Sequence, residues 1–299
     1  MNSDYLSIKY LLRYLSFRTI PKFFWQFVLQ QKYKNILNKH LDFERPLRLS
    51  EKIQYLKLNE KNRQKTLLSD KLEVKKYIST ILPELKFAKV YQVGKCFKDI
   101  DFESLPTSFI LKTNHAWKTN WYVEDKFKIS KDELIFYRKS YDNVLKINYA
   151  YWSYYEMHYE NITPKIFAEE LLVQIDKTVG INNYEVYCFS GVPEFIQIRT
   201  ANPNESIKQC VYSTNWDKLQ FDISWGNLDY FPKPKFLHKM IEYSEILSKD
   251  FNFVRIDYME CNNELYFCEM TFTPASGFLN FKPNIFDLYY GHKLYLKYK

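Results

Sequence analysis

The spacing of apolar residues changes its period along the chain. In the first half it is typical of helices, as in the segment that starts at Asp70, which we expect to cap the helix and where Val74 and Ile78 lie on one helical face. In the second half, short alternating runs such as 184–189 and 194–199, which flank an expected Ser190–Gly191 turn, are typical of antiparallel strands. Helices early and an antiparallel sheet late predict an α+β fold.

The same patterns give an expected order of elements. We expect helices at 8–15, 23–28, 50–56, 70–81, 131–146 and 235–249. We expect strands at 87–93, 108–113, 165–172, 184–189, 194–199, 207–213, 253–259 and 265–271, those from 165 to 213 forming one antiparallel meander. Four segments follow: a basic, aromatic helical extension (1–45), an N-terminal subdomain (46–95), a lid subdomain (96–165) and a C-terminal sheet subdomain (166–299).

Glycine is scarce, and this excludes two kinds of nucleotide site. The chain of 299 residues has 6 glycines, where the usual frequency of about 7% would give roughly 20. They are scattered singly, so neither a G-x-G-x-x-G fingerprint nor a P-loop can be written. The 5 cysteines form no C-x-x-C pair, which favours reduced thiols over a zinc site.

Positive charge is concentrated at the N-terminus. Residues 1–45 hold 8 Lys and Arg against 3 Asp and Glu, which is +5 of the net +8. Because aromatic residues are interleaved with these bases, the segment fits a helix on an anionic membrane surface, but also a basic amphipathic helix packed on its own domain. No apolar run is long enough to cross a bilayer and no signal peptide is visible, so we expect a cytoplasmic protein. The membrane alternative would add peripheral contact at the inner face of the membrane through 1–45.

Carboxylates on the last two strands suggest a metal site. Strand alternation puts Arg255 and Asp257 on one face. Whether Glu269 joins them depends on the turn: a two-residue loop sets Asp257 opposite Cys268, and a three-residue loop sets it opposite Glu269. In the second register two carboxylates face each other at about 5 Å, and Mg²⁺ would relieve their repulsion. The alternative is a solvated sheet face with the acids apart.

Two lysines stand where phosphates would need positive charge. Lys112 ends the strand expected at 108–113, and Lys75 lies in the helix that starts at Asp70. Each lysine taken alone is equally compatible with an ordinary exposed position.

Five blocks, in order, resemble the TupA-like branch of the ATP-grasp superfamily. They are LSEKIQYLKL (49–58), LSDKLEVKKY (68–77), FILKTNH (109–115), ITPKIFAEELL (162–172) and the stretch 253–278 that ends EMTFTPASGF. The match covers roughly residues 46 to 290. It implies an ATP-grasp fold, in which a lid subdomain and a C-terminal, mostly antiparallel sheet clamp ATP. It also implies an enzyme that uses ATP and Mg²⁺ to phosphorylate a carboxylate, which an amine then attacks.

The resemblance assigns roles residue by residue. Lys75 and Lys112 would contact the ATP phosphates, and Glu169, with the backbone from Glu170 to Leu172, would hold the adenine edge. The metal ligands would be Asp257, Glu269 and Thr271, with Thr271 where the superfamily usually has Asn. The catalytic candidates are Arg255, which with the turn at 274–278 would lie near the transferred phosphoryl group and the acceptor, and His115, which is otherwise a plain loop histidine.

Three departures from the family pattern bear on the nucleotide. After Lys112 the family usually runs Cys-Asn-His-Gly-Ser-Gly, but here Ala116 and Lys118 replace both glycines. Glu185 stands where the family tends to have Lys, near the expected ribose and phosphates, and Thr271 replaces the third ligand. These changes leave open an altered donor, weak ATP binding or a degenerate site.

The functional hypothesis is a carboxylate–amine ligase that modifies a bacterial capsule or other surface polysaccharide. Its partners would be ATP, a carboxylated sugar or polysaccharide precursor, and an amine or amino acid; no nucleic acid is expected. The alternatives are a glycosyltransferase or other transferase of capsule biosynthesis, and a non-catalytic ATP-grasp-like protein.

Overall fold

The computed structural model describes residues 12, 15–60, 62–172, 182–200, 208–223 and 230–296. The chain divides into two compact units, each assembled from separated stretches. Unit 1 comprises Met1–Pro21, Asn62–Ile78 and Phe87–Leu172, and unit 2 comprises Lys22–Lys61, Ser79–Lys86 and Val173–Lys299. The four sequence segments divide the chain differently and stay a prediction. Most of the helix expected at 8–15 lies outside the described residues.

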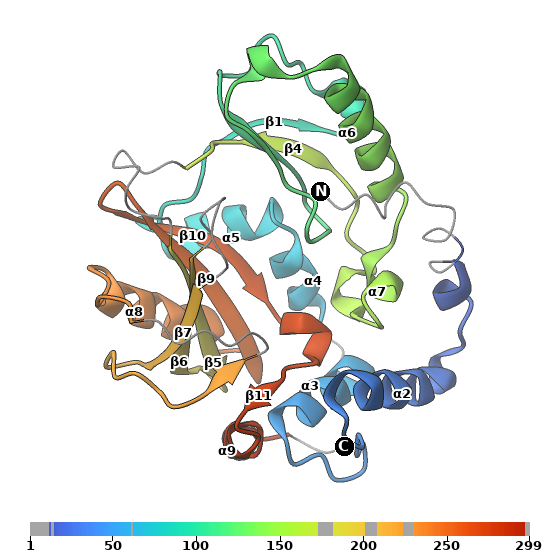
Figure 1. Ribbon diagram of the computed structural model, residues 1–299, viewed down its shortest axis with the longest axis vertical. Helices are drawn as coiled ribbons and strands as arrows, with labels where there is room; N and C mark the ends of the chain where they lie inside the picture. The colour runs from blue at the N-terminus through green and yellow to red at the C-terminus, as the bar shows by residue number, and fades with distance from the viewer. Residues whose placement is uncertain are drawn as a thin grey trace. The chain divides into compact units, whose positions relative to one another are not determined.

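Unit 1 contains a four-stranded antiparallel sheet in the order β1-β4-β2-β3, of which Figure 1 labels β1 and β4. Its strands are β1 (Val90–Gly94), β2 (Phe109–Thr113), β3 (Trp121–Val123) and β4 (Ile166–Glu169). The strand expected at 165–172 is therefore shorter than predicted, and its place in the later meander is wrong. Apolar alternation identifies a strand but carries no information about its partners, and β4 pairs with strands from much earlier in the chain.

The helices of this part of the chain follow their capping signals. They are α4 (Arg63–Ser69), α5 (Glu73–Ile81, which continues into unit 2), α6 (Lys131–Val144) and α7 (Tyr149–Trp152), with 3-10 turns η3 (Phe97–Asp99), η4 (Lys126–Lys128) and η5 (Met157–Tyr159). The Asp70 carboxylate accepts from the backbone N–H groups of Leu72 and Glu73, so the expected cap is confirmed. The short α4 was not predicted.

Unit 2 contains a five-stranded antiparallel sheet in the order β10-β9-β5-β6-β7. Its strands are β5 (Asn182–Phe189), β6 (Val192–Thr200), β7 (Lys208–Ser213), β9 (Phe253–Cys261) and β10 (Glu264–Thr271). Helix α8 (Leu237–Ser248) lies against β5, β6 and β9 (Figure 1). A two-stranded sheet pairs β8 (Asp222–Ile223) with β11 (Phe281–Lys282). The antiparallel late sheet and the helix expected at 235–249 are confirmed.

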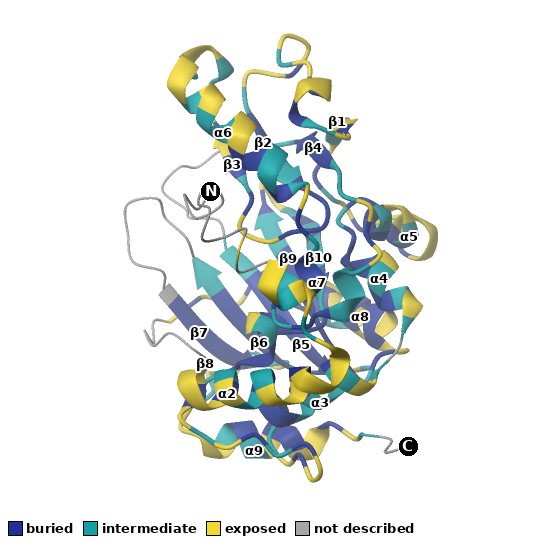
Figure 2. Ribbon diagram, turned by 90° about the vertical axis from the view of Figure 1, so that its right-hand side faces the viewer, coloured by how far each residue is buried: buried dark blue, intermediate teal, exposed yellow. Residues whose placement is uncertain are grey.

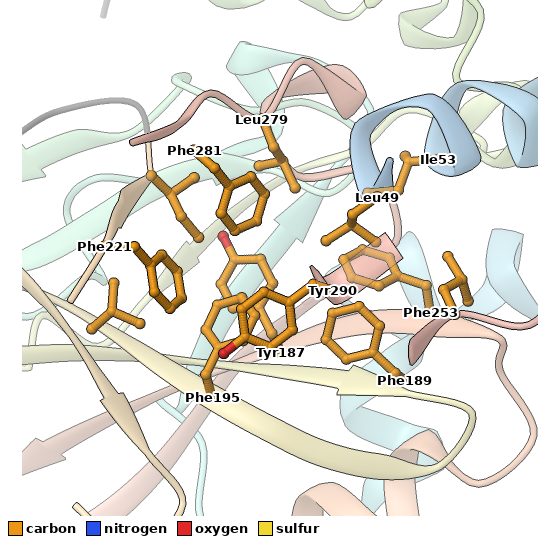
Figure 3. Packing of buried hydrophobic residues seen from close by; sticks show 13 residues of the cluster. Leu49, Ile53, Tyr187, Phe189, Phe195, Phe221, Phe253, Leu279, Phe281 and Tyr290 are labelled. Carbon is orange, nitrogen blue, oxygen red and sulfur yellow. The ribbon is translucent and has the colours of Figure 1, made fainter. Parts of the chain in front are cut away.

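An aromatic core holds one end of this sheet to two helices (Figure 3). Tyr187, Phe195 and Phe253 project from β5, β6 and β9 and pack with Leu49 of α3 (Leu49–Asn59) and Tyr290 of α9 (Ile285–Lys293). Each such side chain contributes roughly 1.5–3 kcal/mol when it is fully buried. Because side chains two apart on a strand share a face, the same sheet face continues from this core into polar positions.

Helix α2 (Trp25–Leu37), preceded by η2 (Lys22–Phe24), extends the helix expected at 23–28. It buries residues four apart, Trp25, Leu29, Tyr33 and Leu37, whereas Phe23, Phe24 and Phe27 are exposed. The hydroxyl of Tyr33 is hydrogen-bonded to that of Ser50 at 2.6 Å, which ties α2 to α3. Among the described helices, none combines the length and apolar character needed to cross a bilayer.

Candidate active site

A buried cluster in unit 1 joins two lysines to one glutamate. The β2–β4 register sets Ile110 opposite Glu169, so Lys112, two residues further on, points to the same face as Glu169. Lys112 Nζ pairs with Glu169 Oε1, and Lys75 Nζ, from α5, lies 2.5 Å from Oε2. Lys75 also donates to the carbonyl of Ala88 at 2.9 Å. We call Lys75, Lys112 and Glu169 the lysine cluster.

The lysine cluster carries more positive than negative charge. Burial raises the pKa of Glu169, but the ammonium groups of Lys112 and Lys75 lower it by more, so the net shift is downward and the carboxylate is ionised. The side chains of Lys75, Lys112 and Glu169 are 9%, 20% and 6% exposed, so water compensates little of the charge. The groups of the cluster itself, two cations and one anion, sum to +1, a composition that favours an anionic ligand.

The adenine-edge assignment is not tested by these contacts. The Glu169 side chain, predicted to serve the nucleobase, is bonded to the two lysines. The backbone N–H of Glu170 donates to the carbonyl of Lys89 at 2.8 Å, and Leu172 is half-buried at the end of unit 1. The roles of Glu169, Glu170 and Leu172 toward a nucleotide stay predictions.

A β-bulge in unit 2 pairs the two carboxylates that the sequence left in doubt. Cys261 pairs with Glu264, so the turn has two residues, Asn262 and Asn263, both left-handed with φ of 49° and 63°. That turn alone would set Asp257 opposite Cys268. The register shifts between Phe267 and Glu269, which leaves Cys268 as the extra residue and sets Glu269 opposite Asp257.

Arg255 lies at the centre of this group. Its Nε and Nη2 donate to the two carboxylate oxygens of Asp257, each at 2.7 Å. Its Nη2 also lies 3.5 Å from Glu269 Oε1 and donates to Thr271 Oγ1 at 3.3 Å. The Thr271 hydroxyl in turn donates to Glu269 at 3.3 Å. The structure therefore brings together the predicted catalytic residue Arg255 and all three predicted metal ligands.

Glu185 is the third carboxylate of the group. The register sets it directly opposite Asp257, and its Oε2 lies 3.4 Å from Arg255 Nη1 and 3.1 Å from Arg199 Nη2. The charge reversal noted at this position is thus neutralised by two guanidinium groups. The pairing of Arg199 with Glu185 could not be predicted from the sequence, because it depends on the β5–β6 register. We call Arg199, Arg255, Glu185, Asp257 and Glu269 the carboxylate cluster.

The donor set of the carboxylate cluster fits a hard divalent cation. When all three carboxylates are ionised, they and the two guanidiniums sum to −1, and oxygen ligands are those that Mg²⁺ prefers. Burial raises the pKa of Asp257 to about 8; Arg255 opposes this shift, and Glu185 and Glu269 add to it. No three His, Cys, Asp or Glu side chains of the described residues are arranged as a metal-ligand set. Because Arg255 pairs with both oxygens of Asp257, a metal would share that carboxylate with it.

The loop after β10 has an unusual backbone. In η6 (Pro274–Gly277), Ala275, Ser276 and Gly277 are all left-handed, with φ of 51°, 52° and 78°. Such a conformation costs a non-glycine residue roughly 1–2 kcal/mol, and strain of this kind is concentrated at functional sites. Gln54 Nε2 and Lys57 Nζ, both from α3, donate to the carbonyl of Ser276 at 3.0 Å.

Gln54 and Lys57 were not predicted as site residues. Both are buried polar side chains three residues apart on α3, and sequence does not distinguish a buried lysine from an exposed one. Gly277 permits their approach, since a Cβ there would lie 2.7 Å from Gln54 Nε2. The contact fixes the orientation of the Ser276–Gly277 peptide.

In the loop after Lys112, one of the two positions where the family has glycine still adopts a left-handed backbone. Lys118 is left-handed with φ of 57°, and its ammonium group lies 5.2 Å from the centre of the Trp117 ring. His115 is buried, with Nε2 3.3 Å from the carbonyl of Val144. Burial lowers the pKa of His115 to about 4, so the ring is neutral at pH 7. It lines a surface cavity of about 400 Å³ that Arg18 also lines, and its catalytic role stays a prediction.

An antiparallel sheet with facing carboxylates, together with a buried lysine pair, is typical of enzymes that handle a metal-bound polyphosphate. A family model for TupA-like ATPgrasp proteins matches residues 51–295. The chain therefore belongs to the TupA-like ATP-grasp family and has the ATP-grasp fold.

Solved structures give more distant likenesses. D-Alanine–D-alanine ligase from Bacillus anthracis, complexed with ATP, has 14% identity, with 69% of this chain and 55% of that chain covered and a TM-score of 0.40. The Helicobacter pylori D-alanine–D-alanine ligase has 14% identity, coverage of 83% and 69%, and a TM-score of 0.41. The ATP-grasp ligase PsnB, complexed with a minimal precursor, has 9% identity, coverage of 70% and 53%, and a TM-score of 0.40. The match thus spans little more than half of two of these chains. No curated protein matches the sequence.

Proposed function

We propose that this protein is an ATP- and Mg²⁺-dependent ligase that joins a carboxylate to an amine through an acyl phosphate. The observation that carries the proposal is the opposite composition of the two buried clusters. The lysine cluster places two ammonium groups on one carboxylate, as binding of a polyphosphate requires, and the carboxylate cluster gathers the oxygen ligands that Mg²⁺ prefers.

The proposed reaction requires the protein to neutralise negative charge and to position the substrates. A substrate carboxylate oxygen attacks the γ-phosphorus of ATP, ADP leaves, an amine attacks the acyl carbon, and phosphate leaves as the nitrogen loses a proton. Lys75 and Lys112 would bind phosphate oxygens, and Asp257, Glu269 and Thr271 would hold Mg²⁺, which neutralises charge as the phosphoryl group moves. Arg255 would stabilise negative charge on the acceptor. The route needs no nucleophilic Ser, Cys or His.

We propose a carboxylated sugar of a bacterial capsule or other surface polysaccharide as the acceptor and an amino acid or amine as the nucleophile. The support is the family match, which supports the ligase reaction more strongly than it supports a sugar as the acceptor. The proposal includes a cytoplasmic location, where ATP is available, at the inner face of the membrane.

One observation favours a second candidate, a nucleotide-binding protein without turnover. Arg255 already pairs with both oxygens of Asp257, so this carboxylate is partly satisfied without a metal.

A thermal-shift titration with ATP tests the proposal, run with Mg²⁺ and with EDTA. A ligand at 100 times its Kd adds about 2.7 kcal/mol to the free energy of unfolding. We expect a Mg²⁺-dependent shift in the wild type and a smaller one in Lys112→Met and Asp257→Ala. The variant Glu264→Gln, which changes an exposed carboxylate on β10, is the control. No shift in the wild type would refute the ligase.

ADP release then separates the ligase from the second candidate. The wild type is incubated with Mg²⁺–ATP, a panel of uronic acids and a mixture of amino acids. Release that requires both a carboxylate and an amine supports the ligase. Nucleotide binding without release under any combination favours the non-catalytic protein. A shift with nucleotide sugars but not with ATP would favour a transferase.

A further inference from the structure

Helix α2 is held firmly in unit 2 by its buried side. Trp25, Leu29 and Tyr33 are fully buried, and Tyr33 is bonded to Ser50. The backbone N–H and the hydroxyl of Ser50 donate to the Asp287 carboxylate of α9 at 2.9 and 2.7 Å. The helix is thus fixed by packing and by a buried hydrogen-bond network, so the side chains on its other face are presented in a defined arrangement.

Three phenylalanines lie on that other face. Phe27 is two residues from both Trp25 and Leu29, which is about 200° around a helix, and it therefore points away from the buried side. Phe23, Phe24 and Phe27 are 74%, 51% and 59% exposed, and the rings of Phe23 and Phe24 lie 4.3 Å apart. Figure 2 shows exposed positions alternating with buried ones along α2. Three adjacent exposed rings form an apolar patch that unit 2 does not use for its own core.

The stretch of sequence around the patch carries positive charge and no negative charge. Residues 5–41 contain seven Lys and Arg and no Asp or Glu. Lys22 and Lys34 are exposed on the described part of this stretch, and Lys34 is seven residues beyond Phe27, on the same side of the helix. The remaining exposed positions of α2 are Gln26, Gln31, Asn35 and Ile36, and all four are uncharged.

We propose that η2 and α2 form a docking surface for a membrane that contains anionic lipids. The rings of Phe23, Phe24 and Phe27 enter the boundary between headgroups and acyl chains, and Lys22 and Lys34 contact the lipid phosphates. Each lysine near such a surface adds to the attraction, and none of it is offset by a nearby acid in the sequence. This inference does not depend on the ligase function, and its test uses no nucleotide.

Vesicle co-sedimentation of the full chain tests the docking surface. The lipids are pure phosphatidylcholine and a phosphatidylcholine–phosphatidylglycerol mixture. We expect binding to the anionic mixture to be at least about tenfold tighter than to phosphatidylcholine. The triple variant Phe23→Ser, Phe24→Ser, Phe27→Ser should lose at least about tenfold in affinity for the mixture.

Matched control variants distinguish vesicle binding through this surface from nonspecific binding elsewhere on the protein. Phe127→Ser, which removes a 78% exposed ring from η4, should leave vesicle binding unchanged. Lys22→Glu with Lys34→Glu should weaken binding at least about tenfold. The control pair is Lys76→Glu with Lys128→Glu, whose lysine side chains are 71% and 83% exposed. All variants change exposed residues, so an unchanged melting temperature confirms that they are folded.

Three results would overturn the proposal. The first is no binding of the wild type to anionic vesicles, and the second is equal binding of the ring variant and the wild type. The third is self-association of the wild type in analytical ultracentrifugation that the ring variant abolishes, because the patch would then be covered by a second copy of the chain. The nucleotide thermal shift should be the same in all these variants, so a failure of docking is distinct from a failure of the ligase function.

Discussion

The lysine cluster and the carboxylate cluster are both buried groups of charges, but they are built in opposite ways. In unit 1 one carboxylate, Glu169, holds two ammonium groups that come from a helix and from a neighbouring strand. In unit 2 the central guanidinium of Arg255 holds three carboxylates that come from three adjacent strands. Ammonium groups outnumber the carboxylate in the first cluster, and carboxylates outnumber guanidinium groups in the second. The difference indicates an anion for the first and a cation for the second.

The largest expected effect is from Glu169→Gln, which removes the charge on which the lysine cluster depends. Breaking a buried ion pair typically costs 3–5 kcal/mol, and we expect about 3 kcal/mol because Lys112 is partly exposed. Urea unfolding measures the change. The neighbouring Glu170→Gln is the control and should cost less than about 1 kcal/mol. Equal losses in the two variants would contradict the cluster.

Next comes Asp257→Asn, which takes one carboxylate from the carboxylate cluster. We expect the affinity for ATP to fall at least about tenfold, or 1.4 kcal/mol, when Mg²⁺ is present. In EDTA the variant and the wild type should bind ATP equally, because the lysine cluster is intact. Calorimetric titration measures both affinities. A loss of the same size in EDTA would show that Asp257 acts without a metal.

A smaller effect is expected from Gly277→Ala, which leaves both clusters unchanged. An alanine there is left-handed and meets Gln54, so we expect a loss of about 1–2 kcal/mol in urea unfolding. Gln54→Ala in the same chain should restore part of it. The control Gly191→Ala, at φ of 85° in the β5–β6 turn, should cost a similar amount without rescue by Gln54→Ala. An affinity for Mg²⁺–ATP that falls tenfold in Gly277→Ala alone would extend the binding site beyond the clusters.

The smallest expected effect is the number of protons that the protein releases when Mg²⁺ binds. Because the pKa of Asp257 is raised to about 8, the carboxylate cluster holds a proton at pH 7 that Mg²⁺ would displace, and this release should disappear above about pH 9. The pKa of Glu169 is lowered, so the lysine cluster holds no proton to release at pH 7. Titration in two buffers of different ionisation enthalpy should show up to one proton for the wild type and Glu169→Gln and none for Asp257→Asn. Proton release by Asp257→Asn would contradict the assignment.

Several features could be predicted from the sequence because they depend on short stretches of chain. The Ser190–Gly191 turn, the Asp70 cap and the strand alternation that places Arg255 beside Asp257 are all local, and all are confirmed. The five blocks predicted the family, which the match over 51–295 confirms.

Other features depend on contacts between distant residues. The Asn262–Asn263 turn by itself predicts the wrong partner for Asp257, and the bulge at Cys268 reverses the outcome. On α2, Tyr33 is buried where its hydroxyl meets Ser50, which is in turn bonded to Asp287, and the sequence spacing of apolar residues does not predict these partners.

The sequence by itself determined the fold class, the family and the residue types of both clusters, because periodicity, turn chemistry and motif spacing are written along the chain. Only the tertiary structure decided that Glu169 joins the two lysines, that Arg199 offsets Glu185, and that Lys57 supports the loop after β10. The physical reason is that the energetic effect of a charged group depends on its burial and on its partners. An exposed lysine is solvated by water, whereas a buried lysine requires a counter-charge, which another part of the fold supplies.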